Sequence, residues 1–393
     1  MTLTISCDDG PHHPNHGMWR VSLDIGDGRE LPFNAEFAED HTFVFLNAEE
    51  RVVSEETTIR GDSIIINHPV FEGVFKGRFT AETISGEFIK PSLDRVVPFT
   101  MSFGDSLRFR PTTEATRQVS GVWETVFSPE DPEARYIAKG LFRQEGSSVT
   151  GTFRTTTGDY RYLEGVMDGD TLRLSTFDTA HAFLFEAIVT DTTLTGTFYS
   201  GNHFVEPFVA KRNPNYELPE ENALTFLKEG YDGIEFAFPD TTGDTVRLSD
   251  ERFQNKVVIV QIMGSWCPNC LDETRYYTDY FNNSYSRDLE FVSLAFEYAP
   301  GPEKAMAGLN RLKQKVGVPY PILLAQYGTE SKLEANKKLP MLNHVLAYPT
   351  TIFIDKKGEV RRIHTGFNGP ATGEKYEDFK QDFESYVESL LTE

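Results

Sequence analysis

The rhythm of hydrophobic and polar positions changes once along the chain, near residue 213. From Gly17 to about Arg212, short stretches such as residues 19–23 and 42–46 alternate apolar and polar side chains, and Gly, Asp, Asn and Pro separate them. A period of two indicates strands with one buried face, and frequent turn residues indicate antiparallel connections between them. We therefore predict that the first half of the chain is all-β and antiparallel.

The pattern in this first half occurs twice. The matching segments are residues 17–19 and 121–123, residues 61–64 and 169–172, and residues 83–88 and 193–198. Because their order and approximate spacing are kept, we predict two tandem meander or barrel-like repeats, residues 17–112 and 117–212, of about seven or eight strands each. The sequence leaves open whether each repeat closes alone or both share one sandwich. Trp19 and Trp123 are predicted to be core residues, with a ligand-binding barrel as the alternative.

From Gly233 onward, apolar runs alternate with segments of helical period. Strands are expected over residues 257–262, 289–296, 321–324, 350–355 and 359–364, a hairpin over 236–248, and helices over 271–280, 302–316, 330–338 and 374–391. This alternation predicts an α/β domain over residues 233–393, with a central mixed sheet covered by helices on both faces. Residues 213–232 are predicted to be a linker that contains a short helix over residues 217–227.

Composition narrows the classes of partner. The 393 residues include 60 acidic and 38 basic side chains, which gives a formal net charge of −22. An acidic surface repels phosphate groups, so neither nucleic acid nor an anionic membrane surface is an expected partner. No apolar run approaches the length of a membrane span, so the chain as written is expected to be soluble.

The first residues contain a candidate lipidation signal. Residues 1–16 are rich in polar residues and proline and are predicted to form a polar tether. Within them, residues 3–9 look like the end of a lipoprotein signal, in which a small residue precedes the acylated cysteine. One expectation is therefore a lipid anchor at Cys7, and the alternative is an ordinary solvent-facing thiol.

The other two cysteines, Cys267 and Cys270, lie where the predicted strand 257–262 ends and a predicted helix begins. Unpaired amide N–H groups and the dipole at a helix N-terminus stabilise an anion, which lowers the pKa of the first thiol. Cys267 is therefore predicted to be the attacking thiolate, and Cys270, one helical turn later, to resolve the mixed disulfide that forms. Pro268 suits the first helical turn because it has no N–H and a pre-set φ.

Two structural roles are the alternatives for this cysteine pair, namely a passive disulfide and half of a zinc site. A zinc site needs four ligands, and the only other cysteine, Cys7, lies far away in sequence beside His12, His13 and His16. For these histidines, a solvated tail is favoured over a metal site. We therefore predict no metal, and a redox-active disulfide in place of a cofactor.

Three short segments carry a resemblance to a known family. They are Trp266-Cys267-Pro268-Asn269-Cys270, the acid Glu273, and Tyr348-Pro349-Thr350. Through them, residues 233–393 resemble the thioredoxin-like fold, and in particular the periplasmic thiol–disulfide oxidoreductases of the TlpA and ResA type. The resemblance implies that Pro349 is a cis proline facing the disulfide, whereas a trans proline that starts a strand is the alternative. It also implies that Tyr348 pairs with a bound peptide, with Trp266 and Pro268 on the same substrate-binding surface.

The resemblance also gives a role to an acid near the cysteines. It implies that Glu273 helps to move the proton of the buried cysteine, whereas a favourable charge in the first helical turn is the alternative. Asp272 is predicted to be a surface residue. Cytosolic thioredoxin has a buried aspartate six residues before the first cysteine, where this chain has Gln261. An amide cannot ionise, so this departure favours the periplasmic subfamily.

These features predict a thiol–disulfide oxidoreductase. We expect a reductase of protein disulfides in the periplasm or cell envelope, recycled by a partner reductase, with the β-half as a docking or spacer module. The alternative is a ligand- or protein-binding β-domain beside a structural disulfide. A peroxiredoxin is disfavoured, because those enzymes have Pro and Thr seven and three residues before the attacking cysteine, where this chain has Val260 and Gly264.

Overall fold

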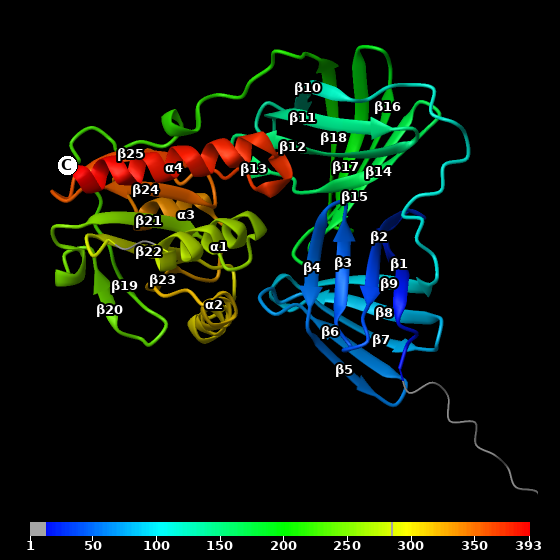
Figure 1. The fold of residues 1–393 in the computed structure, drawn as a ribbon, viewed down its shortest axis with the longest axis horizontal. Helices are drawn as coiled ribbons and strands as arrows, with labels where there is room; N and C mark the ends of the chain where they lie inside the picture. The colour runs from blue at the N-terminus through cyan, green and yellow to red at the C-terminus, as the bar shows by residue number, and fades with distance from the viewer. Residues whose placement is uncertain (1–12, 284–285) are drawn as a thin grey trace, which may run out of the picture.

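The computed structural model describes residues 13–283 and 286–393. Figure 1 shows two antiparallel β-units stacked on each other and a separate α/β unit that packs beside them. The expected fold class, an all-β first half joined to an α/β second half, is confirmed. Cys7 and His12 lie outside the described residues.

The first β-unit is an up-and-down meander. Its strands are β1 (Gly17–Asp24), β2 (Glu30–Phe37), β3 (Phe43–Asn47), β4 (Glu50–Ser54), β5 (Glu56–Arg60), β6 (Ser63–Asn67), β7 (Val74–Phe79), β8 (Thr83–Lys90) and β9 (Arg95–Phe103). The ladder runs β4-β3-β2-β1-β9-β8-β7-β6-β5, so the first strand pairs with the last. A short 3₁₀ turn, η1 (Pro91–Leu93), joins β8 to β9.

The second β-unit repeats this arrangement and closes on itself. Its strands are β10 (Gly121–Phe127), β11 (Tyr136–Glu145), β12 (Ser148–Thr155), β13 (Gly158–Asp159), β14 (Leu163–Asp168), β15 (Thr171–Phe177), β16 (Ala182–Val189), β17 (Thr193–Ser200) and β18 (Phe204–Arg212). β10 pairs with β18, and β11 pairs with both β10 and β12, which completes a barrel. Each repeat therefore has its own sheet.

The repeated sequence segments occupy equivalent places in the two sheets. Trp19 and Trp123 are both completely buried, which confirms them as core residues. The glycine shared by β8 and β17 allows close backbone contact, because a Cβ on Gly86 would lie 2.0 Å from a carbonyl oxygen of β7. A Cβ on Gly196 would likewise lie 2.3 Å from the carbonyl oxygen of Glu186 in β16. The duplication therefore preserves the residues that decide packing.

Aromatic side chains fill and join the two β-units. Phe127 and Phe153 are fully buried inside the second sheet. The ring of Phe177 stacks on Phe33 of the first sheet at a centroid distance of 4.2 Å. Beside it, Asn47 Nδ2 donates to the carbonyl oxygen of Phe177 (2.9 Å), and the Phe177 N–H donates to Asn47 Oδ1 (3.0 Å). The two sheets are thus held together by both apolar and polar contacts.

The predicted helix over residues 217–227 is wrong. This part of the linker contains only a 3₁₀ turn, η2 (Glu221–Ala223), and then meets the α/β unit in an isolated β-bridge between Leu227 and Leu342. The Phe226 N–H donates to Asn343 Oδ1 (2.9 Å), and the Lys228 N–H donates to the carbonyl oxygen of Met341 (2.8 Å). Tertiary partners therefore take the backbone groups that a helix would have used internally.

The α/β unit follows the predicted alternation of strands and helices. Its elements are β19 (Ala237–Pro239), β20 (Thr245–Arg247), η3 (Glu251–Phe253), β21 (Val257–Met263), α1 (Pro268–Asn283), β22 (Leu289–Phe296), α2 (Pro302–Val316), β23 (Ile322–Gln326), α3 (Lys332–Lys338), β24 (Thr350–Ile354), β25 (Val360–Thr365), η4 (Pro370–Thr372) and α4 (Glu374–Thr392). β19 and β20 form the predicted hairpin. The main sheet has the order β23-β22-β21-β24-β25, with parallel pairs on one side of β21 and antiparallel pairs on the other.

Strand β21 lies at the centre of this unit, and all its residues are buried. Ile259 and Met263 face a core shared with α1, α2 and α4. Val258 and Val260 face the opposite core, which is shared with α3 and the hairpin. A continuous apolar strand therefore fits a sheet that is covered on both faces, as predicted.

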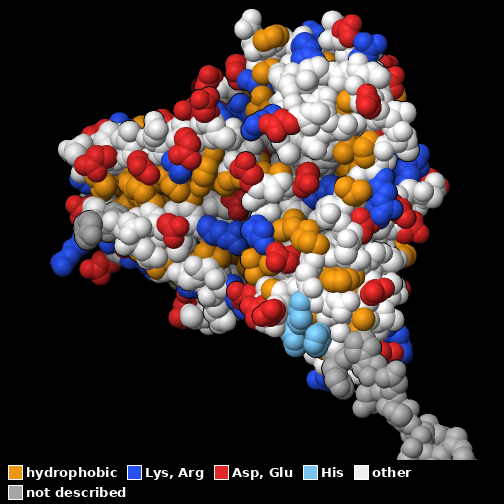
Figure 2. All heavy atoms as spheres, turned by 45° about the vertical axis from the view of Figure 1, so that its right-hand side comes forward, with side chains coloured by type: hydrophobic (Ala, Val, Ile, Leu, Met, Phe, Trp, Pro, Cys, Tyr) orange, Lys and Arg blue, Asp and Glu red, His pale blue; other side chains and the backbone are white. Residues whose placement is uncertain are grey.

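The β-units contribute directly to the core of the α/β unit. Val70 and Phe71, from the turn between β6 and β7, pack in the same cluster as Cys267 and Leu271. Arg311 Nε of α2 donates to the carbonyl oxygen of Val70 (3.1 Å). Figure 2 shows acidic, basic and hydrophobic side chains interspersed where the two halves meet. Within residues 13–283 and 286–393, no helix has the length and apolar character needed to cross a bilayer.

Candidate active site at the junction of the two halves

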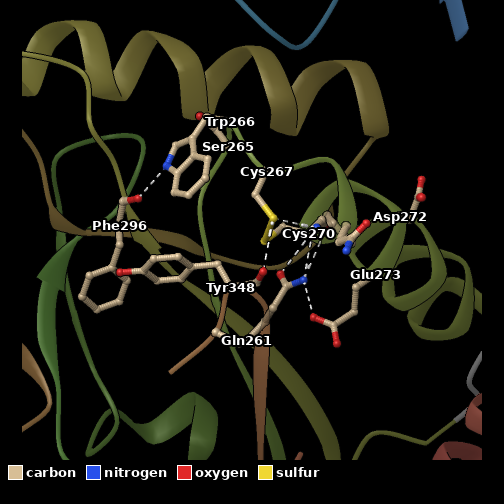
Figure 3. The surroundings of a disulfide bond; sticks show 12 residues. Gln261, Ser265, Trp266, Cys267, Cys270, Asp272, Glu273, Phe296 and Tyr348 are labelled. Carbon is tan, nitrogen blue, oxygen red and sulfur yellow. Dashed lines mark hydrogen bonds between the residues drawn. A yellow bond between two sulfur atoms is a disulfide. The ribbon is translucent and has the colours of Figure 1, made fainter. Parts of the chain in front are cut away.

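The cysteine pair lies at the predicted transition from strand to helix. Cys267 and Cys270 form a disulfide, with Cα atoms 5.2 Å apart. The carbonyl oxygen of Cys267 accepts the Leu271 N–H (3.0 Å), so Cys267 begins the helical hydrogen-bond pattern and Pro268 is the first residue of α1. Figure 3 shows the two sulfur atoms at this end of the helix.

The first sulfur atom lies close to an amide N–H group and a backbone carbonyl. The Cys270 N–H donates to Cys267 Sγ over 3.2 Å, and this contact, together with the helix dipole, favours a negative charge on that sulfur. Cys267 Sγ also lies 3.4 Å from the carbonyl oxygen of Tyr348. Cys270 is fully buried, whereas Cys267 keeps 7% of its surface exposed and lines a cleft. Of the two cysteines, Cys267 is therefore the one that a substrate can reach.

The predicted substrate-binding residues gather around Cys267. The Trp266 indole Nε1 donates to the carbonyl oxygen of Phe296 (2.9 Å), which holds the ring at the carboxyl end of β22 (Figure 3). The Tyr348 ring packs edge-on against it at a centroid distance of 5.7 Å. The Tyr348–Pro349 peptide bond is cis, as the resemblance implied. Their roles in binding stay predictions.

Glu273 is completely buried beneath the cysteines. Burial raises the pKa of its carboxyl to about 7, although the hydrogen bonds from Gln261, Tyr277 and Thr351 lower it. Gln261 Nε2 donates to Glu273 Oε2 (2.9 Å) and lies 3.5 Å from the carbonyl oxygen of Cys270. Tyr277 and Thr351 hydroxyls each lie 3.1 Å from Glu273 Oε1. A carboxyl that titrates near neutral pH can accept and release protons there.

A second buried acid was not predicted from the sequence. Glu297 directly follows β22, and its two carboxylate oxygens accept the backbone N–H and the hydroxyl of Ser265, each at 2.7 Å. Burial raises the pKa of Glu297 to about 7, against the effect of these hydrogen bonds. Because Ser265 stands two residues before Cys267, Glu297 fixes the loop that presents the cysteine. Its position at the carboxyl end of a buried parallel strand is the sequence signal that could have identified it.

Asp272 is not the surface residue that the sequence predicted. Its side chain is 12% exposed and pairs with Arg161 Nη1 of the second β-unit at 2.6 Å. Arg161 also pairs with Glu50 of the first β-unit and with Asp178 at 3.4 Å. Burial lowers the pKa of Arg161, but these carboxylates outweigh it and raise that pKa well above its usual range. One guanidinium group therefore links both β-units to the helix that carries the cysteines.

The second β-unit also touches the residue between the cysteines. Asn269 Nδ2 donates to the carbonyl oxygen of Asp159 (3.1 Å), and the Gly369 N–H donates to Asp159 Oδ2 (2.6 Å). Burial raises the pKa of Asp159 to about 6. Gly158 has a positive φ of 145°, and a Cβ there would lie 2.5 Å from Asn269 Nδ2. This contact therefore requires a glycine.

The described residues contain no group of three or more His, Cys, Asp or Glu side chains arranged to hold a metal ion. The rings of His13 and His16 lie 4.6 Å apart, and both lie within 5.8 Å of His41.

The α/β unit matches known proteins. The sequence model of the Redoxin family matches residues 228–379. Thiol-disulfide oxidoreductase ResA of Geobacillus kaustophilus (strain HTA426) is 26% identical over 166 residues, which are 42% of this chain and 80% of that protein. Thioredoxin-like protein YneN of Bacillus subtilis (strain 168) is 24% identical over 140 residues, which are 36% of this chain and 73% of that protein. The predicted resemblance to thioredoxin-like proteins of the ResA type is thus confirmed.

Solved structures are similar to the same share of the chain. A thiol:disulfide interchange protein of the thioredoxin family from Chlorobium tepidum TLS aligns with a TM-score of 0.31 and 19% identity, over 42% of this chain and 98% of its own. A thiol-disulfide isomerase from Corynebacterium glutamicum aligns with a TM-score of 0.32 and 16% identity, over 43% of this chain and 97% of its own.

Proposed function

We propose that the protein is a thiol–disulfide oxidoreductase that reduces disulfides in polypeptides. The observation that carries this proposal is the position of Cys267 Sγ, which accepts an amide N–H at the start of α1 and lines a cleft, while Cys270 stays buried one turn away. A passive structural disulfide needs neither a reachable sulfur nor an ionisable carboxyl beside it. The names of the ResA relatives agree with this activity.

Reduction begins with the reduced form of the cysteine pair. The Cys267 thiolate attacks one sulfur of the substrate disulfide, and the other substrate sulfur leaves as a thiolate that takes a proton from water. A mixed disulfide then joins Cys267 to the substrate. Trp266, Pro268 and the backbone of Tyr348 form the surface against which the attached segment lies.

Cys270 completes the exchange. Its thiol loses a proton to the Glu273 carboxylate, and the resulting thiolate attacks Cys267 Sγ. The bond between Cys267 and the substrate breaks, and the substrate leaves with its second sulfur as a thiolate. Two electrons have then passed to the substrate, and the Cys267–Cys270 disulfide has formed. An external dithiol reductant must reduce this disulfide before the next cycle.

We place this activity outside the cytoplasm, in the periplasm or cell envelope. Disulfides of polypeptides persist in oxidising compartments, which is where a dedicated reductase has substrates. A lipid anchor at Cys7 would keep the protein at a membrane surface. The partner that restores the dithiol would be another protein thiol.

A stoichiometric exchange assay tests the proposed activity. The full chain is reduced with dithiothreitol, freed of reductant and mixed with an oxidised cystine peptide. We expect one peptide disulfide to be reduced for each Cys267–Cys270 pair that becomes oxidised, as counted by thiol alkylation and mass spectrometry. If the peptide stays oxidised while the protein keeps its thiols, the proposal is wrong.

Glutamine in place of Glu273 is expected to remove a pH-dependent step. Only the carboxylate form accepts a proton, so the wild-type reduction rate is expected to rise as pH increases through about 7. The Glu273→Gln variant loses this rise, and its rate at pH 8 falls by about 10²-fold. The rate of peptide reduction is measured for both proteins at a series of pH values between about 5 and 9.

The same variant is expected to be more stable at alkaline pH. The folded pKa of Glu273, about 7, exceeds the ordinary value of 4.5. The contribution of this carboxyl to the free energy of unfolding is therefore fully present below pH 4.5 and is lost as pH rises through about 7. A neutral glutamine avoids this loss and raises the free energy of unfolding at pH 8 by about 3 kcal/mol. Glu297→Gln, the control, gives a similar gain but keeps the rise in rate. Loss of that rise in both variants would contradict the role of Glu273.

A further inference from the structure

The disulfide opens into a cleft that both halves of the molecule build. The cleft has a volume of about 490 Å³ and is lined on one side by Trp266, Cys267 and Tyr348 of the α/β unit. On the other side it is lined by the second β-unit, including Tyr160 and Phe183. This volume falls in the range of sites that enclose a small ligand or a few side chains.

The wall formed by the second β-unit is held firmly in place. Asp159 and Arg161 flank Tyr160 in sequence, and both are tied to the α/β unit through Asn269, Gly369 and Asp272. The ion pair between Arg161 and Asp272 is largely buried, so water screens it little. The residues on either side of Tyr160 thus join the two walls, and the cleft has a fixed place beside the disulfide.

Aromatic rings and threonine side chains line this wall. Tyr160 and Phe183 are half-buried at the mouth of the closed barrel, with ring centroids 5.4 Å apart. The Tyr160 hydroxyl lies 2.5 Å from the Tyr136 hydroxyl, which donates to Glu206 Oε1 at 2.6 Å. These hydroxyl groups therefore have partners, so the tyrosines offer mainly their ring surfaces to a ligand. Trp266 and Tyr348 supply two further rings on the opposite wall.

We infer that this cleft binds an extended cysteine-containing peptide segment with an aromatic side chain next to the cysteine. The inference rests on the proposed function and adds a substrate class to it. The peptide sulfur meets Cys267, and the neighbouring aromatic ring packs against the faces that Tyr160 and Phe183 turn to the cleft. Aromatic rings pack favourably against one another, and a cleft with rings on both walls selects such a side chain. The β-half is then part of the substrate-binding site and not only a spacer.

A pair of matched peptides tests this specificity. Two oxidised peptides differ only in having Phe or Ser beside the cysteine, and kcat/KM is measured for each with the full chain. We expect the wild type to prefer the Phe peptide by about tenfold, and Phe183→Ala to lower this ratio towards one. Phe204→Ala changes an exposed ring on β18 of the same sheet and is expected to keep the preference. Equal rates for both peptides in the wild type would overturn the inference.

A crosslink gives a second readout that does not depend on the stability of Phe183→Ala. A peptide with benzoylphenylalanine beside its cysteine is trapped on Cys267 in a Cys270→Ser variant and then irradiated. We expect crosslinks to residues 136–183 of the second β-unit, identified by mass spectrometry. Crosslinks found only within residues 233–393 would overturn the inference. If the wild type reduces neither peptide, the proposed function itself fails, whereas reduction without preference removes only the aromatic selectivity.

Discussion

Replacing Cys270 with serine is expected to leave the protein covalently bound to its substrate through Cys267. The buried Cys270 is one helical turn from Cys267, so its thiolate can displace the captured peptide without leaving the site. Serine keeps the shape of the side chain but is not a nucleophile toward disulfides at neutral pH. Multiple turnover is therefore lost, and a one-to-one adduct accumulates.

The adduct is measured by mass spectrometry and by its disappearance when dithiothreitol is added. The experiment uses a Cys7→Ser background, so that Cys267 is the only thiol left in the variant. The matched control is Cys267→Ser in the same background, which keeps Cys270. We expect this control to form no adduct, because Cys270 is fully buried. Adducts of equal yield on both variants would show that the order of attack proposed above is incorrect.

Removal of the Arg161 guanidinium is expected to have the largest effect on stability. Arg161→Met leaves the carboxylates of Glu50, Asp178 and Asp272 without their shared cation, and each of these side chains is at most 12% exposed. Breaking a buried ion pair by removing one partner costs about 3–5 kcal/mol, because an uncompensated charge stays buried. We expect a loss of that size in the free energy of unfolding at pH 8, measured by urea titration.

The loss caused by Arg161→Met is expected to shrink at lower pH. Burial raises the folded pKa of Glu50 and Arg161 lowers it, so this pKa rises further without the guanidinium group; stability is then lost as pH rises through it and returns as pH falls. Arg143→Met is the control, because Arg143 pairs with Glu145 at the surface, where the two side chains are 78% and 70% exposed, respectively. Exposed pairs contribute about 0–1 kcal/mol, so this variant is expected to unfold almost like the wild type. Equal losses in both variants would contradict the role of Arg161.

Arg161 also joins the two halves of the molecule beside the disulfide. Its partners come from β4, from the turn after β15 and from α1, so a single side chain bridges all three units. Two residues before Arg161, the carbonyl oxygen of Asp159 accepts the side-chain N–H of Asn269, which stands between the two cysteines. The second β-unit is therefore anchored beside the disulfide, which agrees with a direct part in substrate binding.

Strong local patterns were sufficient to predict most elements of the α/β unit. The expected strand 289–296 and helix 302–316 agree with β22 and α2 residue for residue. The weak amphipathic pattern of residues 217–227 was misleading, because its backbone pairs with residues 341–343 instead. Helix propensity is a small energy per residue, so a few tertiary hydrogen bonds outweigh it.

For the site, the sequence predicted the residues near the sulfur atoms but not those that surround them. The motif around Cys267 and Cys270 combines a strand end, a helix start and a spacing that together favour a redox-active pair. Glu297, by contrast, is distant in sequence, and its role depends on its contact with Ser265. Asp272 appeared to be a surface residue, because its partner Arg161 is 111 positions away.

The pattern of apolar and polar residues along the chain thus predicted the repeats and the strand–helix alternation, and with them the place of the cysteine pair at the start of α1. Such features depend on interactions between residues close in sequence, where spacing alone determines which side chains share a face. The packing of the second β-unit against the disulfide, and with it the aromatic cleft, depended on contacts between distant segments. Those contacts carry no periodic signal, since one arginine among three carboxylates and one glycine against Asn269 are single residues whose partners only the folded chain brings together.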